Sequence, residues 1–265
     1  MISCDSRQIY REMSIGTAVP SREQLERVRH YFIQDHSIFD PYSAGRYSVE
    51  ANALVDRLFA EGHDTLVMTG GSGFFIQAFE NGLDDFPEAD PELRASLTER
   101  LRTEGVEALR YDLQKLDPES YRSIDIANGQ RVVRALEVCL QTGRPFSSFK
   151  TGAGLSRDYD IEKICLVRPR EELYARADAR VLQMISDGLE EEAHKLHVHK
   201  DLSALQTVGY REFFDWFDGV PDPLNETGLT GLDRVINLIQ RNTRRYIKRQ
   251  VSWFKRDPGF KWVEL

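Results

Sequence analysis

The sequence has 265 residues, of which 41% are hydrophobic and 29% charged, and its net charge at pH 7 is −8. This composition excludes a long disordered chain and is typical of a globular protein with one large domain, or one domain with a substantial insertion. No apolar run reaches the roughly 18 residues that cross a bilayer, and no signal-peptide pattern opens the chain, so we expect a cytoplasmic protein without a membrane segment.

The chain opens on the stretch ISCDSRQ, in which a short apolar run leads into four polar residues. Asp5, Ser6, Arg7 and Gln8 place a carboxylate, a hydroxyl, a guanidinium and an amide at the end of an expected strand. The pattern suits a catalytic or binding loop. It suits an Asx turn or a helix N-cap at least as well, so both interpretations stay open.

Residues 47–62 have helical periodicity, residues 65–69 read as a short buried strand, and a second helix is expected from near Ser72 to residue 82. Such a βα unit belongs to an open parallel sheet, where ligands bind beyond the carboxyl ends of the strands and where Asp5 and Ser72 both fall. The TGGSG turn has glycines that can bring backbone close to a ligand, but it lacks the lysine of a Walker A loop.

The pattern changes over residues 86–150 to successive amphipathic helices punctuated by proline and glycine, with almost no strand signal. We therefore expect an α/β core formed by residues 1–85 and 151–265, interrupted by a helical insertion. Within the insertion, Gln130 stands beside Arg131 and Arg134. This set suits RNA phosphates and base edges, or salt bridges to a neighbouring helix.

Residues 163–169 predict a return to the sheet, and helices are expected over residues 170–187, after Leu189, and over residues 233–254. The last helix has basic residues at helical spacing, so they share one face. These residues are Arg241, Arg244, Arg245, Lys248 and Arg249.

Residues 241–265 contain eight lysines and arginines against two acids, a local charge of +6 that leaves −14 on the other 240 residues. A solvated surface stripe is the ordinary explanation of such a run. No acid lies between Arg241 and Arg256 to pair with these cations, which favours contact with a phosphate backbone.

Metal-binding patterns are weak in this sequence. His194, His197 and His199 do not share one helical face, and no nearby acid or cysteine completes a metal shell. The three cysteines are too scattered for a disulfide framework or a cysteine zinc site. We expect no metal ligand among these side chains.

Several blocks together resemble the tRNA dimethylallyltransferase (tRNA isopentenyltransferase) family, in the same order and over nearly the whole chain. The blocks are ISCDSRQIYREMSIGTAVP, MTGGSGFFIQAF, ADPELRASL, NGQRVVRALEV, LQTVGYREF and RNTRRYIKRQVSWFKRD. The resemblance implies transfer of a dimethylallyl group from dimethylallyl diphosphate, with Mg²⁺, to the exocyclic amine of the adenine 3′ of the anticodon. It also implies a P-loop-kinase-like parallel sheet flanked by helices, with a helical insertion that contacts the tRNA anticodon arm.

Carried over residue by residue, the resemblance makes Asp5 the general base on the adenine amine and gives Ser72, where the family usually has threonine, a hydrogen bond to the base. Arg176 and Arg180, one turn apart, are the candidates for the diphosphate. The implied tRNA contacts are Asp5, Ser6, Arg7, Gln8, Arg94, Gln130, Arg131, Val132, Val133, Arg134, Gly209, Tyr210, Lys248, Arg249, Gln250, Trp253 and Lys255.

The sequence departs from the family pattern in one respect. The family has a GxxxxGK[ST] loop before the aspartate, and these 265 residues contain none. We therefore expect the chain to begin one βα unit late, to bind tRNA on its own, and to be unable to hold dimethylallyl diphosphate productively. The full-length protein is expected to be monomeric, whereas an exposed sheet edge here favours self-association.

Two alternatives stay open from the sequence. One is a tRNA-binding homologue without catalysis, which keeps the basic helix and the insertion. The other is a transferase acting on free adenine nucleotides, against which the basic C-terminal segment and the long insertion argue, since a nucleotide does not need them.

Overall fold

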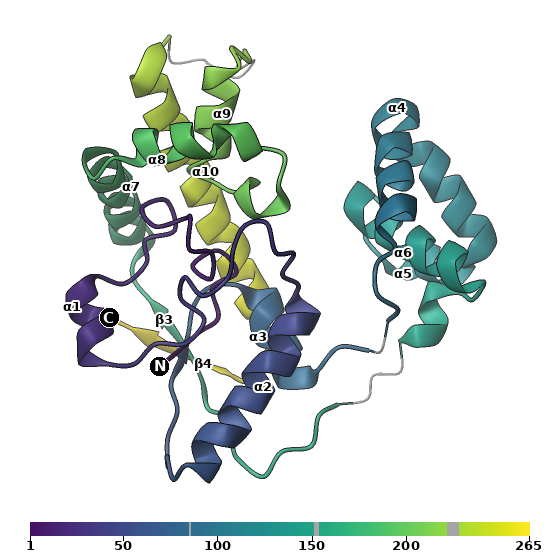
Figure 1. The fold of residues 1–265 in the computed structure, drawn as a ribbon, viewed down its shortest axis with the longest axis horizontal. Coiled ribbons are helices and arrows are strands. Elements are labelled where there is room, and N and C mark those ends of the chain that lie inside the picture. Colours follow the sequence, from purple (N-terminus) through teal and green to yellow (C-terminus); the bar gives the residue numbers. More distant parts are fainter. Residues whose placement is uncertain (85, 151–153, 222–227) are drawn as a thin grey trace. The chain divides into compact units, whose positions relative to one another are not determined.

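The computed structural model describes residues 1–84, 86–150, 154–221 and 228–265 and divides the chain into two compact units (Figure 1). The larger unit contains Met1–Glu80 and Arg157–Leu265, and the smaller contains Asn81–Ser156. The expected insertion, residues 86–150, lies inside the smaller unit. The expected boundary residues 85 and 151 lie outside the described residues.

The larger unit mixes short parallel strands with helices. In chain order its elements are β1 (Ile2–Ser3), α1 (Arg22–Arg27), α2 (Ala44–Ala60), β2 (Met68–Thr69), α3 (Gly73–Asn81), β3 (Lys163–Val167), α7 (Arg170–Ser186), α8 (Leu189–Leu196), η2 (His197–His199), η3 (Ser203–Leu205), α9 (Arg211–Phe217), α10 (Gly231–Phe254) and β4 (Phe260–Glu264). The residue that ends α3, Asn81, is the first residue of the smaller unit.

The strands form two parallel pairs. β1 pairs with β2 in the register Ile2 to Met68 and Ser3 to Thr69. β3 pairs with β4 along five residues each. The strand expected over residues 65–69 is therefore shorter than predicted. The strand expected within residues 163–169 is present as β3. Among the described residues its strand partner is β4, which the sequence analysis missed, so a single sheet joining β3 to β1 and β2 stays a prediction.

Helix α2 connects the first strand pair to the core. Its N-cap Ser43 accepts a hydrogen bond from the Arg46 backbone N–H over 3.1 Å, which begins the helix. Tyr47, fully buried, stacks on Phe75 of α3 with ring centroids 4.6 Å apart. The Tyr47 hydroxyl donates to the Ser3 carbonyl over 3.0 Å. One side chain thus fixes α2 against both α3 and the end of β1.

The smaller unit is helical and has its own hydrophobic core. Its long helix is interrupted at Gly105, whose φ of 79° only glycine adopts readily. Asn128 caps the helix that holds the predicted RNA-binding residues, because its side chain accepts hydrogen bonds from the N–H groups of Gln130 and Arg131. The elements of this unit are α4 (Pro91–Leu116), α5 (Pro118–Ser123), α6 (Gly129–Thr142) and η1 (Phe146–Phe149).

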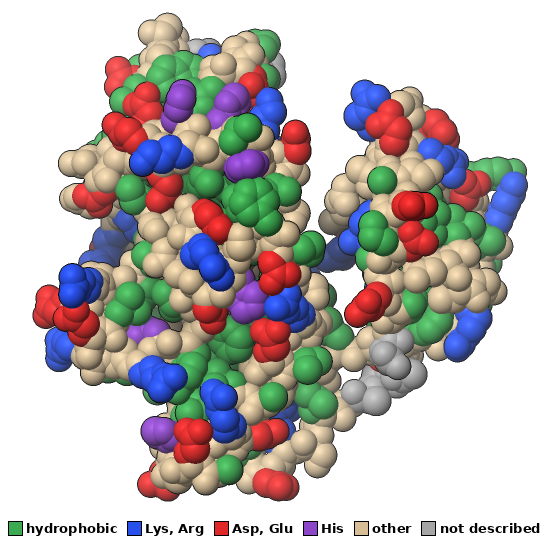
Figure 2. Space-filling model, in the orientation of Figure 1, with side chains coloured by type: hydrophobic (Ala, Val, Ile, Leu, Met, Phe, Trp, Pro, Cys, Tyr) green, Lys and Arg blue, Asp and Glu red, His purple; other side chains and the backbone are tan. Residues whose placement is uncertain are grey.

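Acidic and basic side chains alternate on the face of each unit drawn in Figure 2. Among the described residues, no helix combines the length and the apolar character needed to cross a membrane.

Candidate active site

Asp5 lies just beyond the carboxyl end of β1. The Cys4 N–H donates to the Thr69 carbonyl over 2.8 Å on one side of the strand, and the Ser3 N–H donates to the Tyr31 carbonyl over 3.0 Å on the other. Ser72 follows the carboxyl end of β2 in the same way. The predicted meeting of Asp5 and Ser72 at the ends of neighbouring parallel strands is confirmed, and this edge is where such sheets bind ligands.

The Asp5 carboxylate forms an Asx turn. Its Oδ1 accepts hydrogen bonds from the Arg7 N–H over 2.8 Å and the Gln8 N–H over 3.3 Å. Within the described residues, Oδ2 accepts no hydrogen bond, and the residue is only partly buried. The turn fixes the direction of the carboxylate through one oxygen and leaves the other able to accept a proton from a ligand.

Ser72 joins the two strand ends. Its hydroxyl oxygen accepts a hydrogen bond from the Ser6 N–H over 2.9 Å and donates one to the Ser6 hydroxyl over 3.0 Å. The residue after Asp5 is therefore held by the first residue after the glycine turn.

The glycines of the TGGSG turn make room for the protein's own chain. A Cβ on Gly70 would lie 2.7 Å from the Cys4 carbonyl carbon and 2.9 Å from the Asp5 nitrogen. A Cβ on Gly71 or Gly73 would meet a side chain of α10 at 2.1 or 2.3 Å. The sequence predicted glycines close to a ligand, whereas the structure fills these positions with neighbouring protein atoms.

Three ionisable groups from three different segments surround Asp5. Burial lowers the pKa of the Arg7 and Arg180 guanidinium groups, and the negative charge of Asp5 partly offsets this in both. Burial, followed by the charge of Asp5, raises the pKa of the Tyr246 phenol on α10. The sequence analysis did not single out Tyr246. The sequence could have pointed to Tyr246, because it precedes Gln250 by one helical turn and therefore shares its face of the helix.

Of the two arginines considered for the diphosphate, Arg180 of α7 lies within electrostatic reach of Asp5. The side chains of Arg176 and Arg180 are both exposed at the surface of α7. Arg7 also contributes a cation, and its Nη1 is held by the Ser203 carbonyl over 3.0 Å.

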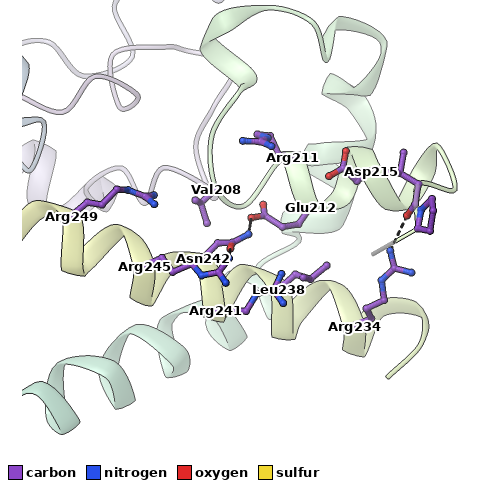
Figure 3. Close-up of a pocket in the computed structure, with 12 residues that line it drawn as sticks. Val208, Arg211, Glu212, Asp215, Arg234, Leu238, Arg241, Asn242, Arg245 and Arg249 are labelled. Atoms are coloured by element: carbon purple, nitrogen blue, oxygen red, sulfur yellow. Dashed lines mark hydrogen bonds between the residues drawn. The ribbon is translucent and has the colours of Figure 1, made fainter. Parts of the chain in front are cut away.

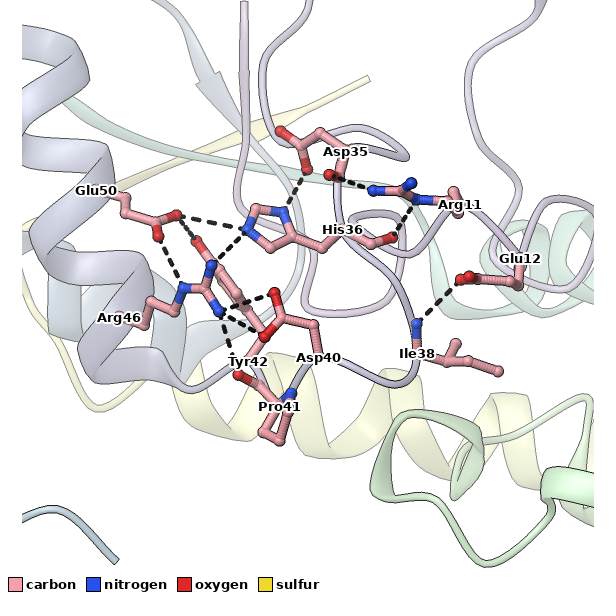
Figure 4. A network of polar contacts seen from close by, with 10 residues as sticks. All are labelled: Arg11, Glu12, Asp35, His36, Ile38, Asp40, Pro41, Tyr42, Arg46 and Glu50. Atoms are coloured by element: carbon pink, nitrogen blue, oxygen red, sulfur yellow. Dashed lines mark hydrogen bonds and ion pairs between the residues drawn. The ribbon is translucent and has the colours of Figure 1, made fainter.

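The loop after Asp5 is braced by a polar network (Figure 4). Arg46 of α2 bonds to both Asp40 and Glu50, and His36 Nδ1 lies 2.8 Å from Asp35 Oδ1. The Arg11 N–H donates to the His36 carbonyl over 2.8 Å. The network therefore attaches the segment after Asp5 to α2.

Gly209 and Tyr210, predicted as tRNA contacts, support this loop from the other side. Tyr210 is fully buried, and its ring lies against Gly16, where a Cβ would clash at 2.5 Å. Its hydroxyl donates to Glu192 over 2.6 Å, and Glu192 accepts the N–H groups of residues 14–16. The Gly209 N–H donates to Glu212. The Tyr210 side chain thus lies in the core of the unit and not at its surface.

A cleft of about 380 Å³ lies between α9 and α10 (Figure 3). The described residues that line it include five arginines and two acids, and one of these acids, Glu212, accepts a hydrogen bond from the Asn242 amide over 2.7 Å. Arg244 points elsewhere and pairs with Asp178 of α7 over 2.6 Å. The inference that no acid pairs with this stripe is therefore wrong for Arg244, because the acid comes from another helix. The arginines of the cleft are Arg211, Arg234, Arg241, Arg245 and Arg249.

In the helical unit, several predicted tRNA contacts have structural partners. Glu137, with no exposed side-chain surface, accepts hydrogen bonds from Arg94 Nε over 3.1 Å and Arg134 Nη1 over 2.7 Å. Val132 and Val133 are 0% and 2% exposed and belong to the core of this unit. Gln130 and Arg131 are exposed at the start of α6. Of the five consecutive residues predicted, these two present their side chains to solvent most fully.

The remaining predicted contacts lie on the last turns of α10. Lys248, Arg249 and Lys255 are exposed, whereas Gln250 and Trp253 are partly buried against the glycine turn. Among the described residues, no group of three or more histidine, cysteine, aspartate or glutamate side chains could hold a metal ion.

A family model described as IPP transferase matches residues 8–257. The chain belongs to this family. Over 265 residues it is 46% identical to the tRNA dimethylallyltransferase of Christiangramia forsetii, a match that covers 100% of this chain and 84% of that protein. It is also 46% identical over 264 residues to tRNA dimethylallyltransferase 2 of Porphyromonas gingivalis, covering 99% and 84%.

Solved structures of the IPP transferase family resemble the fold. The full-length tRNA isopentenylpyrophosphate transferase from Bacillus halodurans is 32% identical, with a TM-score of 0.66, and the match covers 99% of this chain and 80% of that one. A eukaryotic dimethylallyltransferase acting on tRNA has a TM-score of 0.75 at 21% identity, with coverages of 99% and 66%, and shows the likeness of the fold alone.

Proposed function

We propose that this IPP transferase moves a dimethylallyl group from dimethylallyl diphosphate to the exocyclic amine of the adenine 3′ of a tRNA anticodon. The observation that carries the proposal is the Asp5 carboxylate, fixed through Oδ1 at the carboxyl end of β1, with Oδ2 left to accept a proton. Relatives matched over 99–100% of this chain are named tRNA dimethylallyltransferase, which favours transfer over a binding-only protein or an enzyme acting on free nucleotides.

In the proposed reaction, the amine nitrogen forms the new C–N bond as the allylic C–O bond breaks. The bonding electrons leave with the diphosphate, and the amine proton passes to Asp5. A carboxylate is a weak base, but it suffices when proton transfer follows bond formation, because the nitrogen has then become acidic. The adenine must leave the base stack to reach this site, as in other enzymes that modify a base.

The leaving diphosphate needs positive charge, and Arg180 and Arg7 are the cations that we propose for it. The negative charge of Asp5 partly offsets the lowering that burial imposes on the pKa of both guanidinium groups, which supports placing both cations near the carboxylate. Charge neutralisation of the diphosphate is the chemistry that Mg²⁺ supplies when bound.

For the tRNA, we propose that the arginines of the α9–α10 cleft and the exposed Lys248, Arg249 and Lys255 contact phosphates. In the helical unit, the exposed Gln130 and Arg131 are the proposed contacts to the anticodon arm. Arg94 and Arg134 hold α4 and α6 together through Glu137, and their contacts to the anticodon arm stay a prediction. A tRNA substrate also favours a cytoplasmic location.

A GxxxxGK[ST] loop does not occur among these 265 residues. We therefore propose that these residues on their own bind tRNA but do not hold dimethylallyl diphosphate productively. Measurable turnover by the purified 265-residue chain would contradict this. The likeness to solved IPP transferases supports the further proposal that both strand pairs belong to one P-loop-kinase-like sheet.

We also propose that the native protein is a monomer, which sedimentation tests.

The function is tested with labelled dimethylallyl diphosphate and the protein isolated from its host. We expect label in the tRNA, weak competition by AMP, and loss of transfer in Asp5→Asn with tRNA binding retained. Labelling of AMP in preference to tRNA would support the free-nucleotide enzyme instead.

A further inference from the structure

Two side chains at the end of α10 contact the glycine turn before α3. Gln250 Nε2 donates a hydrogen bond to the Gly71 carbonyl over 2.9 Å. The indole of Trp253 covers Gly73, where an added Cβ would lie 2.3 Å from Nε1 and 2.4 Å from Cδ1. Both contacts require glycine, because any side chain at either position would occupy the space of the α10 residue.

The turn held in this way contains Ser72. Ser72 bonds to both the N–H and the hydroxyl of Ser6, and Ser6 directly follows Asp5. A short chain of contacts therefore runs from α10 through the backbone of Gly71 to Ser72 and on to the loop that orients the Asp5 carboxylate. Neither Gln250 nor Trp253 needs to touch the RNA to influence this carboxylate.

The same helical turns present Lys248 and Arg249 to solvent. One segment of α10 thus has exposed cations suited to RNA on one side and contacts to the Ser72 turn on the other. We propose that Gln250 and Trp253 are positioning residues that hold Ser72 and Asp5 in place, so that the helix that meets the RNA also orders the catalytic loop. This inference rests on the proposed function.

The test separates kcat from tRNA affinity in the native chain. We expect Gln250→Ala to lower kcat about tenfold while the Kd for tRNA changes by less than about twofold, as for an interaction that orders the reacting groups. Ser252→Ala is the matched control, since Ser252 lies between the two residues on the exposed face. It should leave both quantities unchanged.

A double-mutant cycle distinguishes the loss of one shared contact from a general loss of folding. Gly71→Ala should displace the Gln250 amide and lower kcat as much as Gln250→Ala, and the double variant should be no worse than either single one. Fully additive losses, or a raised Kd with an unchanged kcat in Gln250→Ala, would overturn the inference. Absence of transfer by the unaltered native protein would instead overturn the proposed function.

Discussion

The hydroxyl of Ser72 both accepts a hydrogen bond from the Ser6 backbone and donates one to the Ser6 hydroxyl, over 2.9 and 3.0 Å. Two segments that lie 66 residues apart in the sequence are joined by this one oxygen. Ser6 directly follows Asp5, so this contact holds the backbone next to the carboxylate.

Removal of the Ser72 hydroxyl should therefore impair catalysis. We expect Ser72→Ala to lower kcat by about tenfold to a hundredfold. Ser72→Thr, which keeps the hydroxyl, should retain most of the activity. Steady-state kinetics on both variants checks this, and equal losses in the two would show that the hydroxyl is not the group that matters.

Arg176 and Arg180 of α7 provide a matched pair of substitutions for testing how the donor, dimethylallyl diphosphate, is bound. Arg180→Ala should raise the KM for dimethylallyl diphosphate and lower kcat, because a cation near the leaving group is lost. Arg176→Ala should change both quantities less, because the charge of Asp5 acts on Arg180. The reverse order of effects would assign the diphosphate to Arg176.

Replacement of two neighbouring arginines of α10 should have different effects on the salt dependence of tRNA binding. Arg245→Ala, in the α9–α10 cleft, should weaken tRNA binding and reduce the slope of log K against log salt by up to about one unit. Arg244→Ala should lower thermal stability instead, because it removes the partner of Asp178. Filter binding at several salt concentrations and thermal melts separate the two effects. An unchanged slope in Arg245→Ala contradicts the assignment.

Protonation of the Asp117 carboxylate should lower the stability of the helical unit at acid pH. Burial raises the pKa of this carboxyl, but hydrogen bonds from Ser120 and Ser147 outweigh burial and hold the pKa below its ordinary value. Its contribution is therefore complete above the unfolded pKa of about 3.9 and is lost as pH falls through the lower folded value. Melting temperatures from pH 6 to pH 2 should fall more steeply for the native sequence than for Asp117→Asn. Parallel curves would contradict this.

The sequence predicted the parts of the site that depend on local order. Asp5 and Ser72 each follow a strand, and parallel strands bring their ends together. The same reasoning missed β4, since its pairing with β3 is made over about a hundred residues of separation. It also did not predict that the buried Glu137 pairs with Arg94 of α4 and Arg134 of α6, because a contact between two helices leaves no periodic signal. The RNA contacts of these two arginines stay a prediction.

The most direct test of the central claim is transfer of labelled dimethylallyl to a tRNA by the protein isolated from its host. Two transcripts are compared, one with adenine 3′ of the anticodon and one with guanine there. The proposed function predicts label in the adenine transcript alone. Tight binding of both transcripts with no label in either would contradict it and restore the binding-only alternative.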